Sequence, residues 1–367
     1  MKIVYVISFI ERRLGFEEYF LELKNRNIDF QVILINRNKS DLYECLKFHG
    51  IFVEEYIYTS KKSLPKTIFK LRNHFKAYKP THLHAHLLEA GFIAGIAGWL
   101  GRVKNRIYTR HHGDMHYIEN KHGRFYDRII HSFYSKIVCV SRSHFDYLIE
   151  TENIKRKKLF IVPNFVDPSI FDLNESNLGQ IREKYLFKKE NINIGINARW
   201  VEFKGLQYVL PALLEVVEKH PLVHFYLFNA KGNDKEMILK LLEKFNSESY
   251  TVVEFESEIM SVYPNFDIFI HCPVRPEAES YGLVYVEAMG SGVPCVFTLS
   301  GIAKDIVIDE FNALVVGFKS EEEISNAICR LIESEELRNK LAANAKSVKS
   351  TFTLVSHVDR MFEVYNK

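Results

Sequence analysis

The chain has 367 residues, of which 47% are hydrophobic, and a formal net charge of +3. This length exceeds what one hydrophobic core usually fills and predicts two domains of ordinary size. The mildly basic balance gives no argument for nucleic acid as a partner, so any cationic site must be local. Five cysteines without a C-x-x-C pair are typical of a reducing compartment and do not indicate a structural zinc site.

The N-terminal apolar run ends at Glu11, Arg12 and Arg13. It reads as a first buried strand, too short for the core of a signal peptide or for a membrane span, and no other apolar segment reaches spanning length. We therefore expect a cytoplasmic protein, soluble or peripheral on the inner face of the membrane.

Short apolar runs alternate with amphipathic stretches, the pattern of parallel strands joined by crossover helices. Residues 167–189 interrupt this pattern with proline, asparagine and charged residues and no strand, so a domain boundary is placed after residue 173. The predicted strands are Lys2–Ser8, Asp29–Asn36, Phe52–Tyr58, Thr81–His86, Arg106–His111, Lys136–Ser141 and Leu159–Pro163, and then Ile192–Asn197, Val223–Phe228, Thr251–Phe255, Asp267–Cys272, Val293–Thr298 and Ala313–Val316.

Residues 61–79 combine a run of basic side chains with apolar ones at helical spacing and contain no acidic residue. A basic amphipathic helix of this kind can lie on an anionic membrane surface. A crossover helix with a solvated outer face explains the pattern equally well, and both interpretations stay open. The basic residues are Lys61, Lys62, Lys66, Lys70, Arg72, Lys76 and Lys79.

Two groups of histidines occur near central strands of the first domain. His111 and His112 follow the fifth strand, at the edge of a parallel sheet where ligands bind. His82, His84 and His86 alternate along one strand and share a face. Zinc binding by these three is a weak interpretation, because the strand looks buried and a fourth ligand is needed.

The first strand of the second domain is followed by Arg199, Lys204 and Gly205 and then by a helical apolar pattern. Two cations at such a strand-to-helix turn could neutralise a diphosphate leaving group, with Arg199 as a planar fork and Lys204 as a point charge.

Residues 275–298 read RPEAESYGLVYVEAMGSGVPCVFT and contain Glu279 and Glu287, separated by seven residues. A helix is predicted from about Tyr281, opened by Gly282. The unpaired N–H groups and positive dipole of its first turn favour an anion such as a diphosphate. The two carboxylates could then reach the polyol ends of one ligand on either side of its phosphates.

This string resembles the signature of the family-4 (group 1) retaining glycosyltransferases of the GT-B superfamily, Glu-x7-Glu followed by Ala-Met and a small-Gly-x-Pro turn. The resemblance implies an α/β fold with two Rossmann-like parallel-sheet domains facing a central cleft. It implies an acceptor-binding domain over residues 1–173, a nucleotide-sugar-binding domain over residues 174–348 and a terminal helix over residues 349–367 that crosses back to the first domain.

The resemblance also implies an activity. A sugar would move, with retention and without a metal, from a nucleotide diphosphate sugar, most often a UDP-sugar, to a glycan or lipid-linked acceptor in cell-surface polysaccharide or glycolipid synthesis. No further cofactor is implied. Alternatives are a sugar-nucleotide epimerase, a phosphorylase of the same fold, or a non-catalytic sugar-nucleotide-binding subunit. The absence of a G-x-G-x-x-G fingerprint argues against a dinucleotide oxidoreductase.

The family's residue roles are carried over by motif. Glu287 would hold the ribose, Glu279 the sugar hydroxyls, and His111, with His112 as competitor, would contact the donor sugar. A single glycine, Gly15, stands in the loop after the first strand where the family has a glycine-rich turn, and the nearby arginines hint at an anionic acceptor. The implied catalytic residues are His111, Arg199, Lys204 and Glu279, and the implied donor-binding residues are Gly15, Arg199, Lys204, Glu279, Tyr281, Gly282, Leu283, Val284 and Glu287.

Overall fold

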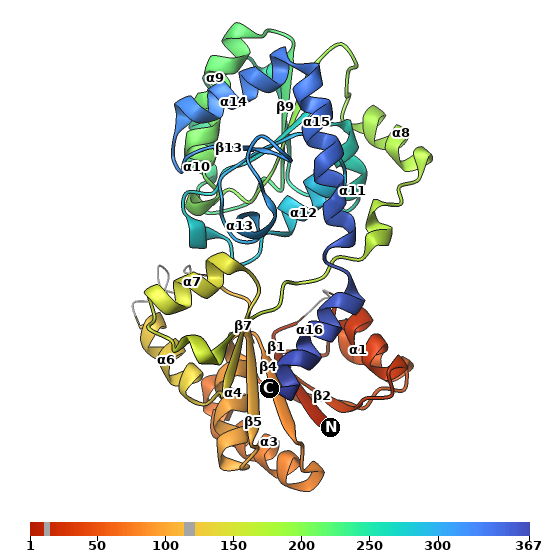
Figure 1. The fold of residues 1–367 in the computed structure, drawn as a ribbon, viewed down its shortest axis with the longest axis vertical. Helices are drawn as coiled ribbons and strands as arrows, with labels where there is room; N and C mark the ends of the chain where they lie inside the picture. Colours follow the sequence, from red (N-terminus) through yellow and green to blue (C-terminus); the bar gives the residue numbers. More distant parts are fainter. Residues whose placement is uncertain (11–14, 114–121) are drawn as a thin grey trace. The chain divides into compact units, whose positions relative to one another are not determined.

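The computed structural model describes residues 1–10, 15–113 and 122–367 of the chain. Its contacts divide the chain into two units: an N-terminal unit of Met1–Phe165 with Phe352–Lys367, and a C-terminal unit of Val166–Thr351. Each unit contains one parallel sheet covered by helices (Figure 1). The predicted α/β fold with two Rossmann-like parallel-sheet domains is confirmed.

The division falls after Phe165, whereas the sequence analysis placed the boundary after residue 173. The intervening residues belong with the C-terminal unit because Phe171 packs there. A Cβ built on Gly290 would lie 2.4 Å from the Phe171 ring, so the ring occupies the space that this glycine leaves. The boundary placed after residue 173 therefore lies several residues beyond the change of unit, which falls next to the start of the polar stretch.

The sheet of the N-terminal unit has seven strands in the order β3-β2-β1-β4-β5-β6-β7. The chain order reverses between β1 and β4, which makes their carboxyl ends the switch point where open α/β sheets bind ligands. The strands are β1 (Lys2–Ser8), β2 (Asp29–Asn36), β3 (Val53–Ile57), β4 (His82–His86), β5 (Asn105–Arg110), β6 (Lys136–Cys139) and β7 (Leu159–Ile161), and the helices are α1 (Phe16–Asn25), α2 (Asp41–Phe48), α3 (Leu64–Tyr78), α4 (Leu88–Leu100), α6 (Gly123–Ser132), α7 (Arg142–Glu150) and α16 (Leu354–Asn366).

The sheet of the C-terminal unit has six strands in the order β10-β9-β8-β11-β12-β13, with its switch point between β8 and β11. Its fully buried apolar strand residues match the near-continuous hydrophobic runs expected of strands covered on both faces. The strands are β8 (Ile192–Asn197), β9 (Val223–Phe228), β10 (Tyr250–Val253), β11 (Ile268–His271), β12 (Cys295–Phe297) and β13 (Leu314–Val315), and the helices are α8 (Glu175–Lys184), α9 (Leu206–Lys219), α10 (Lys235–Leu242), α11 (Ile259–Val262), α12 (Leu283–Gly290), α13 (Ala303–Ile306), α14 (Glu321–Glu333) and α15 (Glu335–Ala345).

The terminal helix α16 packs against α1 in the N-terminal unit. Its anchor is Tyr365, whose hydroxyl lies 2.9 Å from the hydroxyl of Tyr5 and 2.7 Å from Nδ1 of His84. His84 also lies 2.7 Å from Oγ1 of Thr109, through its Nε2. His82 contacts the backbone oxygen of Tyr365 at 3.2 Å. His82 and His84 thus contact buried hydrogen-bonding groups of the protein itself, and His84 uses both ring nitrogens in this way.

No helix in the described part of the chain is both long enough and apolar enough to cross a bilayer.

The buried histidines are held in the neutral form. Burial, reinforced by neighbouring histidine charges, holds the pKa of His84 and His86 well below the ordinary value. Burial, then the charges of His112 and His357, lowers the pKa of His111 to about 4. Protonating any of them in place would leave a charge in a buried, largely uncharged environment.

We predict that acid destabilises the N-terminal unit as the pH falls from about 6.5, where unfolded histidine titrates, toward 4. In this window the histidines are protonated in the unfolded chain but stay neutral in the folded unit. The free energy of unfolding of the N-terminal unit therefore drops by up to about 1.4 kcal/mol per histidine per pH unit. Urea unfolding at pH 7 and pH 5.5, with hydrogen exchange of the β4 segment as the probe, measures this loss of stability. In His84→Gln the free energy of unfolding should depend less on pH. An unchanged pH dependence would contradict the assignment of the acid effect to the buried histidines.

Candidate active site

Glu279 carries a buried carboxylate in the loop that follows β11. Its Oε1 accepts hydrogen bonds from Nζ of Lys204 and, at 3.0 Å, from Nε2 of His271. Its backbone N–H donates to Oγ of Ser300 at 3.0 Å. Burial raises the pKa of this carboxyl, but the Lys204 charge and the His271 hydrogen bond outweigh burial and lower it to about 2. Glu279 is therefore ionised at neutral pH and acts as a hydrogen-bond acceptor.

Two glycines allow the surrounding loops to approach this closely. Gly205 has φ +81°, and a Cβ there would lie 2.0 Å from the carbonyl oxygen of Cys272 at the end of β11. Gly301 has φ +56°, and a Cβ there would lie 2.7 Å from Cβ of Glu279. Only glycine accepts this combination of backbone angle and space. Lys204, which directly precedes Gly205, is consequently brought against the loop that carries Glu279.

Helix α12 begins at Leu283, two residues later than the predicted start at Tyr281. Gly282 is the cause, because its φ of 84° is left-handed and does not belong to a right-handed helix. Tyr281 is buried, and its carbonyl accepts from the N–H of Ile302 at 2.7 Å, so it fixes the loop. The first-turn N–H groups, at exposed Leu283 and half-buried Val284, have no partner within the helix.

Glu287 lies on the same helix, one turn beyond Leu283. Its Oε2 accepts a hydrogen bond of 2.8 Å from the hydroxyl of Tyr263, which in turn accepts one of 3.0 Å from Nδ2 of Asn197 at the end of β8. Burial raises the pKa of Glu287, and the Tyr263 bond opposes that rise. The carboxylate is thus oriented by a side chain from another element, which no sequence motif indicated.

Arg199 and Lys204 approach the same aromatic ring. Cζ of Arg199 lies 5.9 Å and Nζ of Lys204 5.5 Å from the centroid of Phe203. Arg199 is exposed and, among the described residues, has no carboxylate partner, whereas Lys204 is paired with Glu279. Two cations on either side of a strand-to-helix turn favour an anionic ligand, and only the charge of Lys204 is compensated by Glu279.

In the N-terminal unit, the two candidate histidines turn to different neighbours. Nε2 of His111 lies 3.2 Å from Nδ1 of His86, and the two rings stack. His112 contacts Oδ2 of Asp127 at 3.2 Å, within a buried cluster that also contains Arg110. This arrangement favours His111 as the site histidine, because His112 belongs to a charged structural network.

Gly15 precedes helix α1, with φ +77°. A Cβ there would lie 3.1 Å from the ring of Phe165, so the position requires a small residue for packing within the N-terminal unit. The arginines expected to meet an anionic acceptor, Arg12 and Arg13, lie outside the described residues.

One group of described residues has the makings of a metal site. Potential ligand atoms of Glu17, Cys45 and His49 lie within 4.8 Å of one another. Oε1 of Glu17 is already 3.6 Å from Nε2 of His49, a contact that accounts for both without a metal. The trio is one ligand short of a closed structural zinc site, and it is not among the residues that the motifs select.

Two family models match this chain, one in each unit. The model described as glycosyl transferases group 1 matches residues 179–348, and the one described as glycosyltransferase family 4 matches residues 18–170. The chain belongs to the group 1, family 4-type glycosyltransferases of the GT-B superfamily, as the motif around Glu279 and Glu287 predicted.

Several curated proteins are similar to the chain. The capsular polysaccharide biosynthesis glycosyltransferase CapM of Staphylococcus aureus is 24% identical, with 94% of this chain and 91% of CapM aligned. The UDP-Gal:alpha-D-GlcNAc-diphosphoundecaprenol alpha-1,3-galactosyltransferase of Escherichia coli is 22% identical over 82% of this chain and 79% of that protein. An uncharacterised glycosyltransferase of Methanocaldococcus jannaschii is 27% identical, with 68% of this chain aligned to it. The alignment spans 64% of that relative's own length.

Solved structures share the fold. HepE of Anabaena in complex with UDP superposes with a TM-score of 0.81 at 19% identity, covering 100% of both chains. A UDP-GlcNAc 2-epimerase of Neisseria meningitidis has a TM-score of 0.64 at 16% identity, covering 99% of this chain and 100% of the epimerase. The fold alone is therefore compatible with more than one chemistry on nucleotide sugars.

We predict that removing one partner of the buried Lys204–Glu279 pair is costly. Lys204→Met should lower the free energy of unfolding at pH 7 by about 3 kcal/mol, because it leaves a buried carboxylate without its cation. Glu279→Gln added to it should recover most of the loss. The stabilisation should be complete above about pH 4.5 and disappear as the pH falls toward 2, the pKa of the folded carboxyl.

Urea unfolding of the single and double variants measures this effect. The matched control is Lys235→Met, which breaks an exposed pair with Glu254 and should leave the free energy of unfolding almost unchanged. A Lys204→Met cost as small as that of the control would show that the buried pair does not stabilise the unit.

Proposed function

We propose that the chain is a retaining glycosyltransferase that moves a sugar from a UDP-sugar onto a glycan or lipid-linked acceptor. The observation that carries this proposal is the buried, ionised Glu279 beside the start of α12, with Arg199, which has no carboxylate partner among the described residues, at the neighbouring strand end. This combination offers acceptors for sugar hydroxyls next to donors for a diphosphate. One relative is named for capsular polysaccharide biosynthesis and another as a galactosyltransferase for a diphosphoundecaprenol-linked sugar. Both support a role in cell-surface polysaccharide or glycolipid assembly.

The C-terminal unit would bind the donor. Glu287, held by Tyr263, would accept from the ribose hydroxyls and Glu279 from the sugar hydroxyls. Arg199 and the first N–H groups of α12 would bind the diphosphate. Lys204 has three N–H donors, so its bond to Glu279 leaves others for a phosphate oxygen. The UDP complex of HepE supports a uridine nucleotide as the donor.

The anomeric configuration would be retained because the acceptor oxygen attacks the anomeric carbon from the same face that the phosphate leaves. The bond between the sugar's anomeric carbon and the phosphate oxygen breaks, the acceptor oxygen bonds to that carbon, and the acceptor proton passes to the departing phosphate. Glu279, with its low pKa, does not supply a proton at neutral pH. Arg199 and Lys204 would stabilise the departing charge, which is a role for cationic side chains in place of a metal ion. His111, neutral because of its low pKa, would contact the sugar as a hydrogen-bonding group.

The donor-site roles separate binding from transfer. Arg199→Ala should lower the transfer rate roughly a hundredfold, since it removes a contact that strengthens as the diphosphate leaves, and should weaken UDP binding. Glu279→Gln should slow transfer while UDP binds almost normally. Calorimetric titration with UDP and initial transfer rates measure both, with Lys235→Gln as a control that should change neither. A rate for Arg199→Ala within threefold of the unmutated chain, or loss of UDP binding in Glu279→Gln, would refute these assignments.

The product decides between the proposed activity and its alternative. Proton coupling constants of the transferred sugar should show the donor's anomeric configuration retained. An inverted product would remove the retaining mechanism. Epimerised donor formed without any acceptor would favour the sugar-nucleotide epimerase instead, whose fold this chain shares.

We also propose that the enzyme is cytoplasmic and associates with the inner face of the membrane through α3. Lys66 and Lys76 are exposed on this helix, Lys62 is exposed in the turn that precedes it, and Phe69 of the helix is 55% exposed. Basic residues near an anionic surface contribute about 1 kcal/mol each, and an exposed ring adds apolar contact.

Changing Lys62, Lys66 and Lys76 to glutamine should weaken binding to phosphatidylserine vesicles at low salt without altering UDP binding. Flotation of the vesicles measures the bound fraction. The matched control changes three exposed lysines of the C-terminal unit, Lys235, Lys240 and Lys244, and so removes the same charge elsewhere. Equal losses in both triple variants would assign the effect to net charge and end the proposal for α3.

A further inference from the structure

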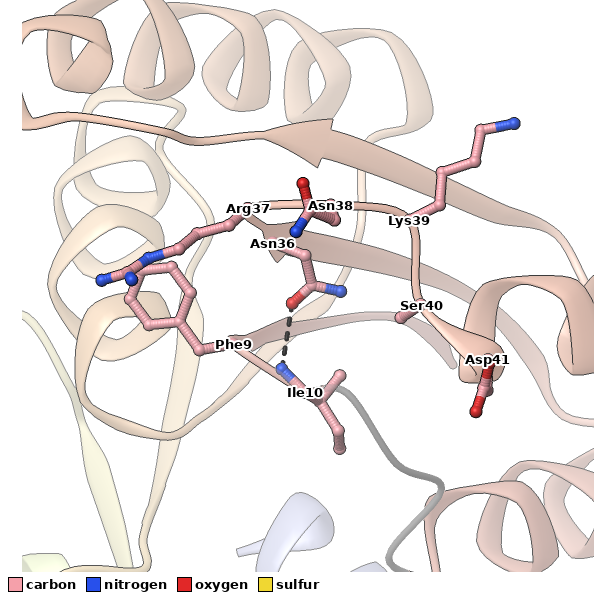
Figure 2. Close-up of a pocket in the computed structure, with 8 residues that line it drawn as sticks. All are labelled: Phe9, Ile10, Asn36, Arg37, Asn38, Lys39, Ser40 and Asp41. Carbon is pink, nitrogen blue, oxygen red and sulfur yellow. Dashed lines mark hydrogen bonds between the residues drawn. The ribbon is translucent and has the colours of Figure 1, made fainter.

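A cavity of about 570 Å³ opens at the carboxyl ends of β1 and β2, next to the switch point of the N-terminal unit. None of its lining residues belongs to the site residues selected from the sequence. Figure 2 shows them: Phe9, Ile10, Asn36, Arg37, Asn38, Lys39, Ser40 and Asp41. Carboxyl ends of parallel strands are where this type of sheet binds ligands, so the cavity lies at a position suited to function.

Phe9 is held in this cavity at a conformational cost. Its φ of 49° is left-handed, which is unfavourable for a bulky residue, and its side chain is still 42% exposed. Such strain persists only where surrounding contacts impose it, and it is concentrated at functional sites. An exposed aromatic ring in a strained turn is therefore a candidate contact for a ligand.

A buried hydrogen-bond network imposes that conformation. The N–H of Phe9 donates to the carbonyl of Ile35 at 3.0 Å, and the N–H of Ile10 donates to Oδ1 of Asn36 at 3.0 Å, as the dashed line in Figure 2 shows. Nδ2 of Asn36, a residue only 3% exposed, donates to Oε1 of Glu55 at 2.8 Å. The turn is thus fixed to the end of β2 and, through Asn36 and Glu55, to β3, and the ring of Phe9 is positioned before any ligand arrives.

Arg37 lies alongside that ring, with its Cζ 5.3 Å from the ring centroid. In Figure 2 its side chain runs next to Phe9, whereas Lys39 extends away and Asp41 lies at the other side of the cavity. Among the described residues Arg37 has no carboxylate partner. A guanidinium packed on an aromatic ring keeps its N–H edge available for a phosphate or carboxylate.

We propose that this cavity is the acceptor subsite and that the acceptor is a saccharide carrying an anionic group, a phosphate or a carboxylate. Arg37 binds the anion, Phe9 contacts the sugar ring, and the exposed amide of Asn38 faces its hydroxyls, while Ser40 stays bonded to Glu55. This inference rests on the proposed glycosyl transfer, which requires an acceptor, and adds the chemical class of that acceptor. Mono-anionic and diphosphate-linked sugars share the chemistry that Arg37 recognises.

Calorimetry of the full chain with saturating UDP present, so that the donor site is filled, tests the proposal. The probes are glucuronate, glucose 1-phosphate, glucose and inorganic phosphate. We expect the two charged sugars to bind at least tenfold more tightly than either glucose or phosphate alone. The stronger of the two tells whether the anion is a carboxylate or a phosphate. Glucose or inorganic phosphate binding as tightly as the charged sugars would overturn the proposal.

Three variants assign the binding to these residues. Arg37→Gln, at an exposed position that should not affect folding, should reduce charged-sugar affinity at least tenfold, and Arg37→Lys should give an intermediate loss. Phe9→Gly relaxes the left-handed backbone while removing the ring, so it should fold, by circular dichroism, yet bind the charged sugars several-fold more weakly. The control Lys104→Gln removes one exposed charge elsewhere in the unit. Unchanged affinity in Arg37→Gln, or an equal loss in Lys104→Gln, would refute the subsite.

The same titrations keep this inference apart from the proposed function. UDP affinity should be equal in the unmutated chain and in Arg37→Gln. Failure of UDP to bind the unmutated chain would count against the donor site, whereas UDP binding without any preference for charged sugars would overturn only the acceptor subsite.

Discussion

Parallel strand pairing is the constraint on which both candidate sites depend. In both sheets every strand pairing is parallel, so each segment that follows a strand emerges at the same edge. At the two switch points, between β1 and β4 and between β8 and β11, the following segments leave in opposite directions and open a space. Lys204 follows β8 and Glu279 follows β11, so residues 75 positions apart in the chain meet as an ion pair.

Burial of the Glu279 charge then determines much of the local structure. A buried carboxylate is tolerated only with compensating partners, and here Lys204 and His271 supply them. Their approach needs Gly205 and Gly301, where any Cβ would collide with the neighbouring loop. The glycines, the cation and the histidine are therefore parts of one arrangement, although the sequence motif displays only some of them.

The elements were largely predictable, because strands buried on both faces leave apolar runs that the sequence displays directly. The start of α12 was not predictable in this way, because the left-handed backbone of Gly282 delays the helix by two residues. His271 and Tyr263 were missed because each acts through a tertiary hydrogen bond, and nothing near either residue in the sequence marks that bond. The choice between His111 and His112 likewise depends on Asp127, fifteen residues along the chain.

The cavity that we propose as the acceptor subsite could not be predicted from the sequence for a related reason. In the sequence Arg37 is one polar residue among several after a strand, whereas Arg12 and Arg13 follow the first strand and suggest an anionic acceptor. What distinguishes Arg37 is its packing on Phe9, whose left-handed backbone is imposed by Asn36. Periodicity and motif spacing carry no information on a strained turn that is stabilised by a neighbouring strand.

Each unit contains an arginine that packs on a phenylalanine ring, but the charges around the two arginines differ. Arg37 lies 5.3 Å from the ring of Phe9 and Arg199 lies 5.9 Å from that of Phe203, and neither has a carboxylate partner among the described residues. Packing on a ring limits the freedom of the long side chain and leaves its N–H edge exposed, so less entropy is lost when an anion binds. Beside Arg199, the charge of Lys204 is already compensated by Glu279. On the proposed function, the attraction of the donor site for a diphosphate would come chiefly from Arg199 and the first turn of α12, while Lys204 would serve first to keep Glu279 ionised.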